Sequence, residues 1–303
     1  FRGILSSPPT IRLSDVVAVG EATIVYDREG NEIDQYVSTN SNRLSVGMDE
    51  IPDYLGKAFV AIEDERFYQH NGIDFKSIIR AGYQFFKTGG EEAQGASTIT
   101  QQLLKNTVFT DWTSEGNNKI KKIKRKIQEQ YLALEITKYY SKDEILLRYM
   151  NAINLGQNTL GVESASLRYF GKHCSELTIS ECAVIASITQ NPSKYNPIRH
   201  PEENVKRREK CLTKMLELGF ITQAQYDEAM ADTDAVYERI GLYDIDYQEA
   251  NATTGSYFSD AVYEQVKQDL ILAGYNENMA ETLLTSGGLR VESTLDPKIQ
   301  AIL

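Results

Sequence analysis

The sequence reads Glu63-Asp64-Glu65-Arg66-Phe67-Tyr68-Gln69-His70-Asn71-Gly72-Ile73-Asp74 at the point where a helix is predicted to end. The approach, residues 51–62, has Pro52 suited to a first helical turn and apolar residues on one face. Glu63 then falls at the negative end of the helix dipole, beside two further carboxylates. Both influences favour the neutral carboxyl, which makes the carboxylate a stronger base. The stretch therefore indicates a carboxylate suited to take up a proton, although charged residues at a helix end are often simply solvated.

Four further segments follow in a fixed order. They read Gly95-Ala96-Ser97-Thr98-Ile99-Thr100-Gln101-Gln102-Leu103-Leu104-Lys105-Asn106, then Arg125-Lys126-Ile127-Gln128-Glu129, then Arg148-Tyr149-Met150-Asn151-Ala152-Ile153-Asn154-Leu155-Gly156, and then a segment that opens His200-Pro201 and contains Arg207-Arg208. Together these segments resemble the motifs of the peptidoglycan glycosyltransferases of family 51, the amino-terminal catalytic module of class A penicillin-binding proteins. The resemblance covers residues 51–230.

The resemblance implies a reaction and two catalytic carboxylates. The family joins lipid II, a lipid-linked disaccharide-peptide, into β-1,4 glycan by one inverting displacement of undecaprenyl pyrophosphate. Glu63 matches the general base, which removes the proton of the acceptor hydroxyl, and Glu129 matches the second acidic position. A helix salt bridge is the structural alternative for Glu129, because Arg125 lies four residues earlier on the same helix face. The resemblance also implies a lysozyme-like helical fold with two lobes about a cleft.

The same motifs imply a set of substrate-binding positions. They are Asp64, Ser97, Thr98, Gln101, Lys105, Lys121, Arg125, Lys126 and Asn151. Six of the eight residues from 119 to 126 are basic, and such charge binds phosphates well. The sequence before them is hard to align, so the family position matched to Lys121 could equally belong to Lys119 or Lys122. Capping alone would explain Thr98, since Thr98 and Gln101 form a capping box at a helix start.

Periodicity predicts how the basic helix packs. Apolar residues recur at helical spacing and predict a core-facing stripe, with the cations on the other faces. The stripe comprises Ile120, Ile123, Ile127, Tyr131 and Leu134.

His70 follows the acidic cluster and is interpreted as a structural, loop-ordering residue, because no serine or cysteine nucleophile is indicated nearby.

Bulk composition limits the function classes. A net charge of −11 over 303 residues argues against a nucleic-acid-binding protein. The three cysteines lie in apolar helical patterns and are expected to be buried free thiols. The sequence requires no cofactor and shows no metal-ligand spacing; the family association leaves Mg²⁺ or Mn²⁺ open, with no ligands assigned.

Patterning also predicts the domain organisation, a mainly α (α+β) chain. Residues 1–50 form a β-rich linker segment, 51–232 the glycosyltransferase domain, and 233–303 a helical segment with a β linker towards a transpeptidase domain whose Ser-x-x-Lys motif is absent from the chain. Residues 23–37 and 289–294 are expected to share one small sheet. The resemblance implies an enzyme on the extracytoplasmic face of the cell membrane, with a single-pass anchor outside this sequence. Its implied partners are lipid II, the lipid-linked glycan chain, the membrane surface, the transpeptidase domain and the cell-wall synthesis machinery.

Two other functions remain open at this point. A lysozyme-like peptidoglycan hydrolase would use Glu63 as a general acid, but a neutral glycan leaving group needs no cationic clamp. A non-catalytic scaffold that binds lipid II would not need both carboxylates. The sequence does not reveal the stem-peptide chemistry, the glycan length or the oligomeric state.

Overall fold

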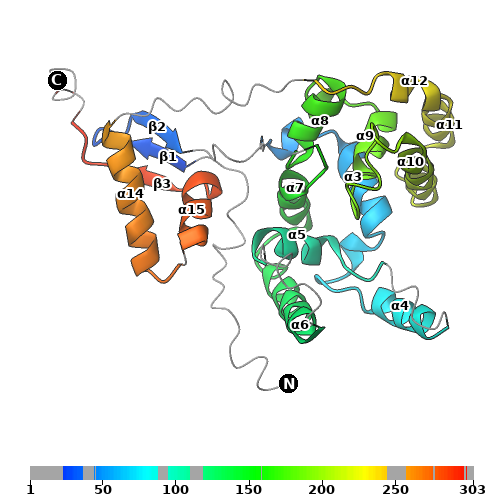
Figure 1. The fold of residues 1–303 in the computed structure, drawn as a ribbon, viewed down its shortest axis with the longest axis horizontal. Coiled ribbons are helices and arrows are strands. Elements are labelled where there is room, and N and C mark those ends of the chain that lie inside the picture. The colour runs from blue at the N-terminus through cyan, green and yellow to red at the C-terminus, as the bar shows by residue number, and fades with distance from the viewer. Residues whose placement is uncertain are drawn as a thin grey trace. The chain divides into compact units, whose positions relative to one another are not determined.

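The computed structural model describes residues 23–36, 44, 46–87, 95–109, 119–157, 159–243, 257–275, 277–296 and 298. They fall into two compact units (Figure 1). The first comprises residues 46–245, and the second combines residues 11–45 with 246–303, within the described ranges. The helical unit is thus one continuous stretch, whereas the second unit is assembled from the segments on either side of it.

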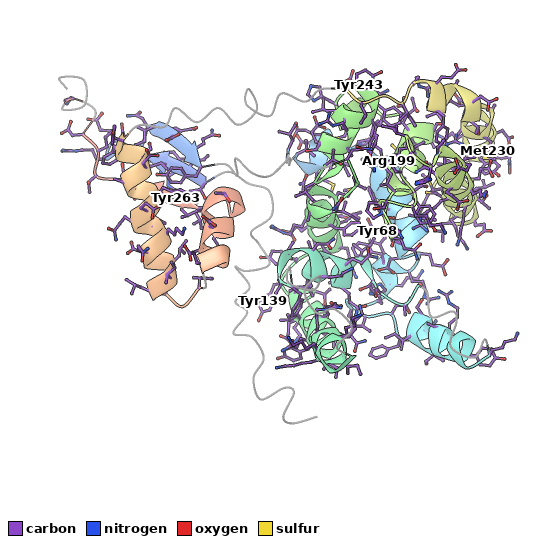
Figure 2. The ribbon with its side chains drawn as sticks, viewed as in Figure 1. Tyr68, Tyr139, Arg199, Met230, Tyr243 and Tyr263 are labelled. Atoms are coloured by element: carbon purple, nitrogen blue, oxygen red, sulfur yellow. The ribbon has the colours of Figure 1, made fainter. Side chains whose placement is uncertain are left out.

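The second unit contains the small sheet that the sequence predicts. Its strand order is β2-β1-β3, with β1 (Thr23–Tyr26) antiparallel to β2 (Glu32–Tyr36) and parallel to β3 (Arg290–Glu292). Two helices complete this unit, α14 (Tyr257–Leu272) and α15 (Glu277–Ser286). The Tyr263 ring, labelled in Figure 2, packs edge-on against Tyr36 with ring centroids 5.1 Å apart. The prediction that residues before and after the helical unit share one sheet is confirmed.

Apart from an isolated bridge between Asn154 and Leu160, the regular elements in the described residues of the first unit are helices. Its elements are η1 (Met48–Glu50), α3 (Asp53–Glu63), η2 (Phe67–Gln69), α4 (Phe75–Lys87), α5 (Ile99–Thr107), α6 (Lys119–Ile136), α7 (Lys142–Ala152), α8 (Val162–Phe170), η4 (Cys174–Glu176), α9 (Ile179–Ala186), α10 (Pro201–Glu217), α11 (Gln223–Ala231) and α12 (Thr233–Glu238). Four of these helices begin with the same reciprocal cap. A threonine or serine side chain accepts from the third backbone N–H, and a Gln or Glu returns the bond, at Thr98, Ser141, Thr178 and Thr222.

Two groups of helices make the core of this unit. Helices α3, α9 and α10 pack against one another, and α5 packs against both α6 and α7 (Figure 1). Nearly every residue of α9 is buried, so this helix lies in the centre of its group. The three cysteines are free and buried, as the sequence predicts. The mainly helical fold with a small sheet is confirmed, and the lysozyme-like two-lobed form remains a prediction.

The predicted core stripe on α6 is wrong. Ile123 is 58% exposed and Tyr131 47% exposed, whereas Glu129 is completely buried. The helix is rotated so that Leu132, Ala133 and Ile136 enter the core in line with Glu129. The reason is electrostatic: the basic residues one turn before Glu129 provide partners for its charge, so a carboxylate occupies the inner face that periodicity assigned to apolar residues.

No helix in the described residues is long and apolar enough to cross a bilayer.

Candidate active site

Glu63 is the last residue of α3, and its side chain is only 9% exposed. Its carboxylate receives three side-chain donors from elsewhere in the chain. Arg207 Nη2 lies 2.6 Å from Oε1, the Thr189 hydroxyl also bonds Oε1, and Gln102 Nε2 donates to Oε2 at 3.0 Å. The helix end predicted from the sequence is confirmed, and it delivers the carboxylate into a polar site built by α3, α5 and the α9–α10 region.

The neighbouring carboxylates turn away from Glu63. Asp64 accepts the backbone N–H of Ile99 at 3.0 Å and bonds His70 Nε2 at 3.0 Å. Glu65 lies 3.5 Å from the Lys214 ammonium. The expected crowding of three like charges is therefore absent, and the charged group that bonds Glu63 is the Arg207 guanidinium. Asp64 instead stabilises the positive end of α5, with His70 as its second partner, as expected of a structural histidine.

A second buried side chain fixes the orientation of Gln102. The Tyr149 hydroxyl donates to Gln102 Oε1 at 3.2 Å, which leaves the amide nitrogen directed at Glu63. Burial, followed by the charge of Glu63, raises the pKa of Tyr149 well above its ordinary value, so its hydroxyl keeps its proton. The amide therefore cannot rotate to present its oxygen to Glu63 without losing both bonds.

Glu129 forms the second acidic centre, and its partners lie on its own helix. Arg125 Nη1 bonds Oε1, and Lys126 Nζ lies 2.8 Å from Oε2. Lys126 also donates to the Ser97 hydroxyl at 2.9 Å, which joins α6 to the loop before α5. The predicted salt bridge of Glu129 is confirmed. Two cations thus surround one buried carboxylate, so the cluster keeps a positive charge.

Lys105 belongs to the same cluster. Burial lowers its pKa; Glu129 opposes this effect, and Arg125 and Lys126 add to it. Lys121 lies one turn before Arg125 on α6 and is exposed. The structure therefore brings Ser97, Lys105, Arg125, Lys126 and Glu129 together, with Lys121 further along the same face.

Helix α5 connects the two acidic centres. Gln102 contacts Glu63, and Lys105, one turn later on α5, is electrostatically coupled to Glu129. Side chains three residues apart on a helix lie on the same face. A single face of α5 therefore carries one group for each centre, and the site combines a carboxylate with a cationic cluster along one helix.

Three of the predicted substrate-binding residues are buried and have structural partners. Thr98 and Gln101 cap each other at the start of α5, and the Thr98 hydroxyl donates to the Gly72 carbonyl oxygen at 2.6 Å. The Asn151 side chain bonds both backbone groups of Val46, at 3.2 and 3.0 Å. These bonds account for all three side chains, and substrate contact by any of them remains a prediction.

Comparison with known proteins identifies the family. The model of the Transglycosylase family matches residues 29–216. The chain belongs to this family. It is 38% identical to penicillin-binding protein 1A of Clostridium perfringens over 98% of this chain and 43% of that protein, and 34% identical to penicillin-binding protein 1A/1B of Bacillus subtilis over 99% of this chain and 30% of that protein. The chain therefore spans less than half the length of these relatives.

A solved structure gives a weaker match. The crystal structure of penicillin-binding protein 1A from Haemophilus influenzae aligns with 93% of this chain and 28% of that one, at 22% identity and a TM-score of 0.37. The sequence-based resemblance to the family is confirmed by the family model and the curated relatives.

The transglycosylase site does not fit a protein-held metal ion. Among the described residues, no group of three or more His, Cys, Asp or Glu side chains could hold one. Asp64, Glu63 and Glu129 could each have supplied oxygen ligands. Their carboxylates are instead bonded by a histidine and a backbone amide, by three side-chain donors, and by two cations, respectively.

Sequence reasoning missed four residues around Glu63. They are Gln102, Thr189, Gln190 and Arg207. Gln102 and Arg207 stand inside motifs that the sequence analysis quotes, but their side-chain direction depends on the packing of α5 and α10 against α3. Adjacent Arg208 is fully buried and bonds Ser180 Oγ at 2.8 Å, so the pair Arg207-Arg208 divides between the site and the core.

Proposed function

We propose that the chain is a peptidoglycan glycosyltransferase that polymerises lipid II into β-1,4 glycan, with Glu63 as general base. The observation that carries the proposal is the pairing along α5 of a nearly buried carboxylate with a cationic cluster. The reaction needs both. A base must take the proton of the acceptor 4-hydroxyl, and cations must stabilise the pyrophosphate that leaves.

The proton step uses Glu63 Oε2. Oε1 is occupied by Arg207 and Thr189, whereas Gln102 is the donor to Oε2 among the described residues. A carboxylate oxygen accepts two hydrogen bonds, so Oε2 can receive the acceptor hydroxyl without breaking the bond to Gln102. As the hydroxyl oxygen attacks the anomeric carbon, its proton passes to Glu63, and the bond between that carbon and the pyrophosphate oxygen breaks.

The cationic cluster binds the leaving group. Lys105, Arg125 and Lys126 surround Glu129, which holds the two α6 cations in place while part of their charge remains available. Charge-assisted hydrogen bonds to phosphate are among the strongest in proteins. Glu129 therefore acts as a positioning residue in this proposal, since both of its oxygens are already bonded. Lys121 extends the cluster along α6.

The proposal includes contact with a membrane surface, where the lipid tail of the substrate remains. Helix α4 carries an exposed apolar row at spacing four: Phe75 is 65%, Ile79 72% and Tyr83 69% exposed. Lys76, Arg80 and Lys87 flank the row. An apolar face with flanking cations suits an interfacial helix. Phe85 and Phe86, which the sequence also favours for this role, have side chains outside the described residues.

The remaining assignments follow from the family. We place the chain on the extracytoplasmic face of the membrane, within a longer penicillin-binding protein that carries the anchor and a transpeptidase domain. The relatives' names and lengths support this placement. The cell-wall synthesis machinery supplies the lipid II and receives the glycan.

Product analysis with purified lipid II tests the reaction. Formation of long glycan supports the transferase. Shortening of added glycan instead would indicate the hydrolase, and binding of lipid II without any product would indicate the scaffold. An Arg125→Gln/Lys126→Gln variant should bind inorganic pyrophosphate more weakly than a Lys122→Gln/Lys124→Gln control, which removes the same charge from exposed positions on α6.

Vesicle binding tests the membrane contact. Changing Phe75, Ile79 and Tyr83 to serine should weaken co-sedimentation with anionic lipid vesicles without lowering the melting temperature, because all three side chains are already in water. Unchanged vesicle binding would remove α4 from the proposal.

A further inference from the structure

The surroundings of Glu63 include the guanidinium of Arg207, which also bonds a second residue. Arg207 Nη2 bonds Glu63 Oε1 at 2.6 Å, and its Nη1 donates to Gln190 Oε1 at 2.9 Å. The guanidinium carbon also lies 4.9 Å from the centre of the Tyr195 ring. Three contacts from three directions therefore fix one guanidinium, whose side chain is only 12% exposed.

The turn that holds Arg207 has an unusual backbone. Gln190 has φ +59°, and the N–H of Asn191 donates to the Thr189 carbonyl oxygen at 2.5 Å across it, the bond of a γ-turn. A positive φ is uncommon for a residue with a side chain, and γ-turns of this hand are strained. Backbone strain of this kind persists where the surroundings enforce it, often at functional sites.

The strained turn directs two consecutive side chains at one place. The Thr189 hydroxyl bonds Glu63 directly, and Gln190 bonds the arginine that bonds Glu63. A relaxed turn with a different φ would rotate one side chain away from the other. The strain therefore coincides with the geometry that keeps the carboxylate and the guanidinium together.

We infer that Arg207, held by the Gln190 turn and the Tyr195 ring, is a positioning residue for the base Glu63. This inference rests on the proposed function and deepens it. The guanidinium occupies Oε1 and turns Oε2 to the acceptor hydroxyl.

The first test compares Arg207→Gln, Arg207→Lys and Lys206→Gln in the full chain with detergent-solubilised lipid II. Arg207→Gln should lower kcat by about 10- to 100-fold, the effect expected of a misplaced catalytic group, with KM nearly unchanged. Arg207→Lys keeps a positive charge that can bond Glu63 and should restore part of kcat. Lys206 is the matched control, because its side chain is 70% exposed and its ammonium pairs with Glu203.

A double-mutant cycle separates positioning from direct substrate contact. Added to Glu63→Gln, Arg207→Gln should cost little further activity, since the group through which it acts is already disabled. A full additional loss in that background would overturn the inference and assign Arg207 to the substrate. If Arg207→Gln turned over normally while Glu63→Gln was inactive, the role of Arg207 would be overturned and the proposed function would stand. Near-normal turnover by Glu63→Gln would overturn the proposed function and this role with it.

Gln190→Gly provides a readout that a purely structural role would not give. Glycine adopts a positive φ without strain, so the melting temperature should be unchanged or higher, while kcat falls because Arg207 loses its anchor. A parallel loss of stability and activity would instead mean that the turn only supports the fold, and would contradict the inference.

Discussion

Glu63 interacts with Gln102 and Glu129 with Lys105, both on one face of α5, but the residues that bond the two carboxylates come from different distances along the chain. Glu129 bonds residues three and four positions earlier on the same helix. The three side chains that bond Glu63 lie 39, 126 and 144 residues away. A carboxylate with local partners is held wherever its helix forms, whereas one with distant partners is held only when the whole unit has packed. The first arrangement suits a permanent cationic cluster, and the second suits a group whose environment must be set for chemistry.

The largest expected effect is on the rate of polymerisation, and it distinguishes the role of Glu63 from that of Glu129. Glu63→Gln should reduce polymerisation by about 10²- to 10⁴-fold, because an amide keeps the size of the side chain and cannot accept the proton. Its circular dichroism spectrum should match that of the wild-type protein, because the swap keeps the shape of the side chain. A Gln variant with near-normal turnover and a normal spectrum would show that Glu63 is not the base.

The next effect concerns stability at Glu129. Arg125→Gln/Lys126→Gln should lower the free energy of unfolding by about 3 kcal/mol, because it removes both cations that are bonded to a fully buried carboxylate. Adding Glu129→Gln should then restore part of the loss, since the buried charge is gone. Urea denaturation measures both, with Lys122→Gln/Lys124→Gln as the control. No recovery in the triple variant would mean that the cations stabilise α6 in another way.

A pH experiment tests the cationic cluster. The lowered pKa of Lys105 means that its ammonium deprotonates at a lower pH than an ordinary lysine at 10.5. Binding of inorganic pyrophosphate should therefore weaken as the pH rises through a window that begins below 10.5. Lys105→Arg should keep its affinity across that window, because a guanidinium stays charged. Identical alkaline profiles for the two proteins would exclude Lys105 from the pyrophosphate site.

The smallest effect addresses α5, which both centres share. Thr98→Ala should cost about 1 kcal/mol of stability through loss of its cap. It should also lower turnover, because α5 carries both Gln102 and Lys105. Thr222→Ala removes the same type of cap from α11, a helix outside both acidic centres, and should cost similar stability with unchanged turnover. Equal activity of the two variants would argue that α5 keeps its position without the cap.

The sequence predicted much of the local structure. The end of α3, the capping box at Thr98 and the salt bridge of Glu129 all depend on residues within four positions of one another. Hydrogen bonds and ion pairs at that range form within a single helical turn, so the spacing of the residues in the sequence is enough to predict them. The paired strands were also found, from their β-branched residues.

The prediction of which face of α6 is buried failed because it considered only the spacing of apolar residues. Periodicity counts apolar residues and takes their row as the buried one. It does not weigh the stabilisation that a buried carboxylate gains from two cations on its own helix, and here that arrangement puts Glu129 inside and Ile123 in water.

The sequence by itself determined the family, the helix that ends at Glu63, and the carboxylate and cations that the reaction needs. Only the tertiary structure decided what surrounds Glu63. Arg207 and Arg208 are adjacent and alike in sequence, yet the packing of α10 against α3 and α9 places one at the carboxylate and the other in the core. Side-chain direction on a helix depends on which neighbour the helix packs against, and that contact spans more than a hundred residues of sequence.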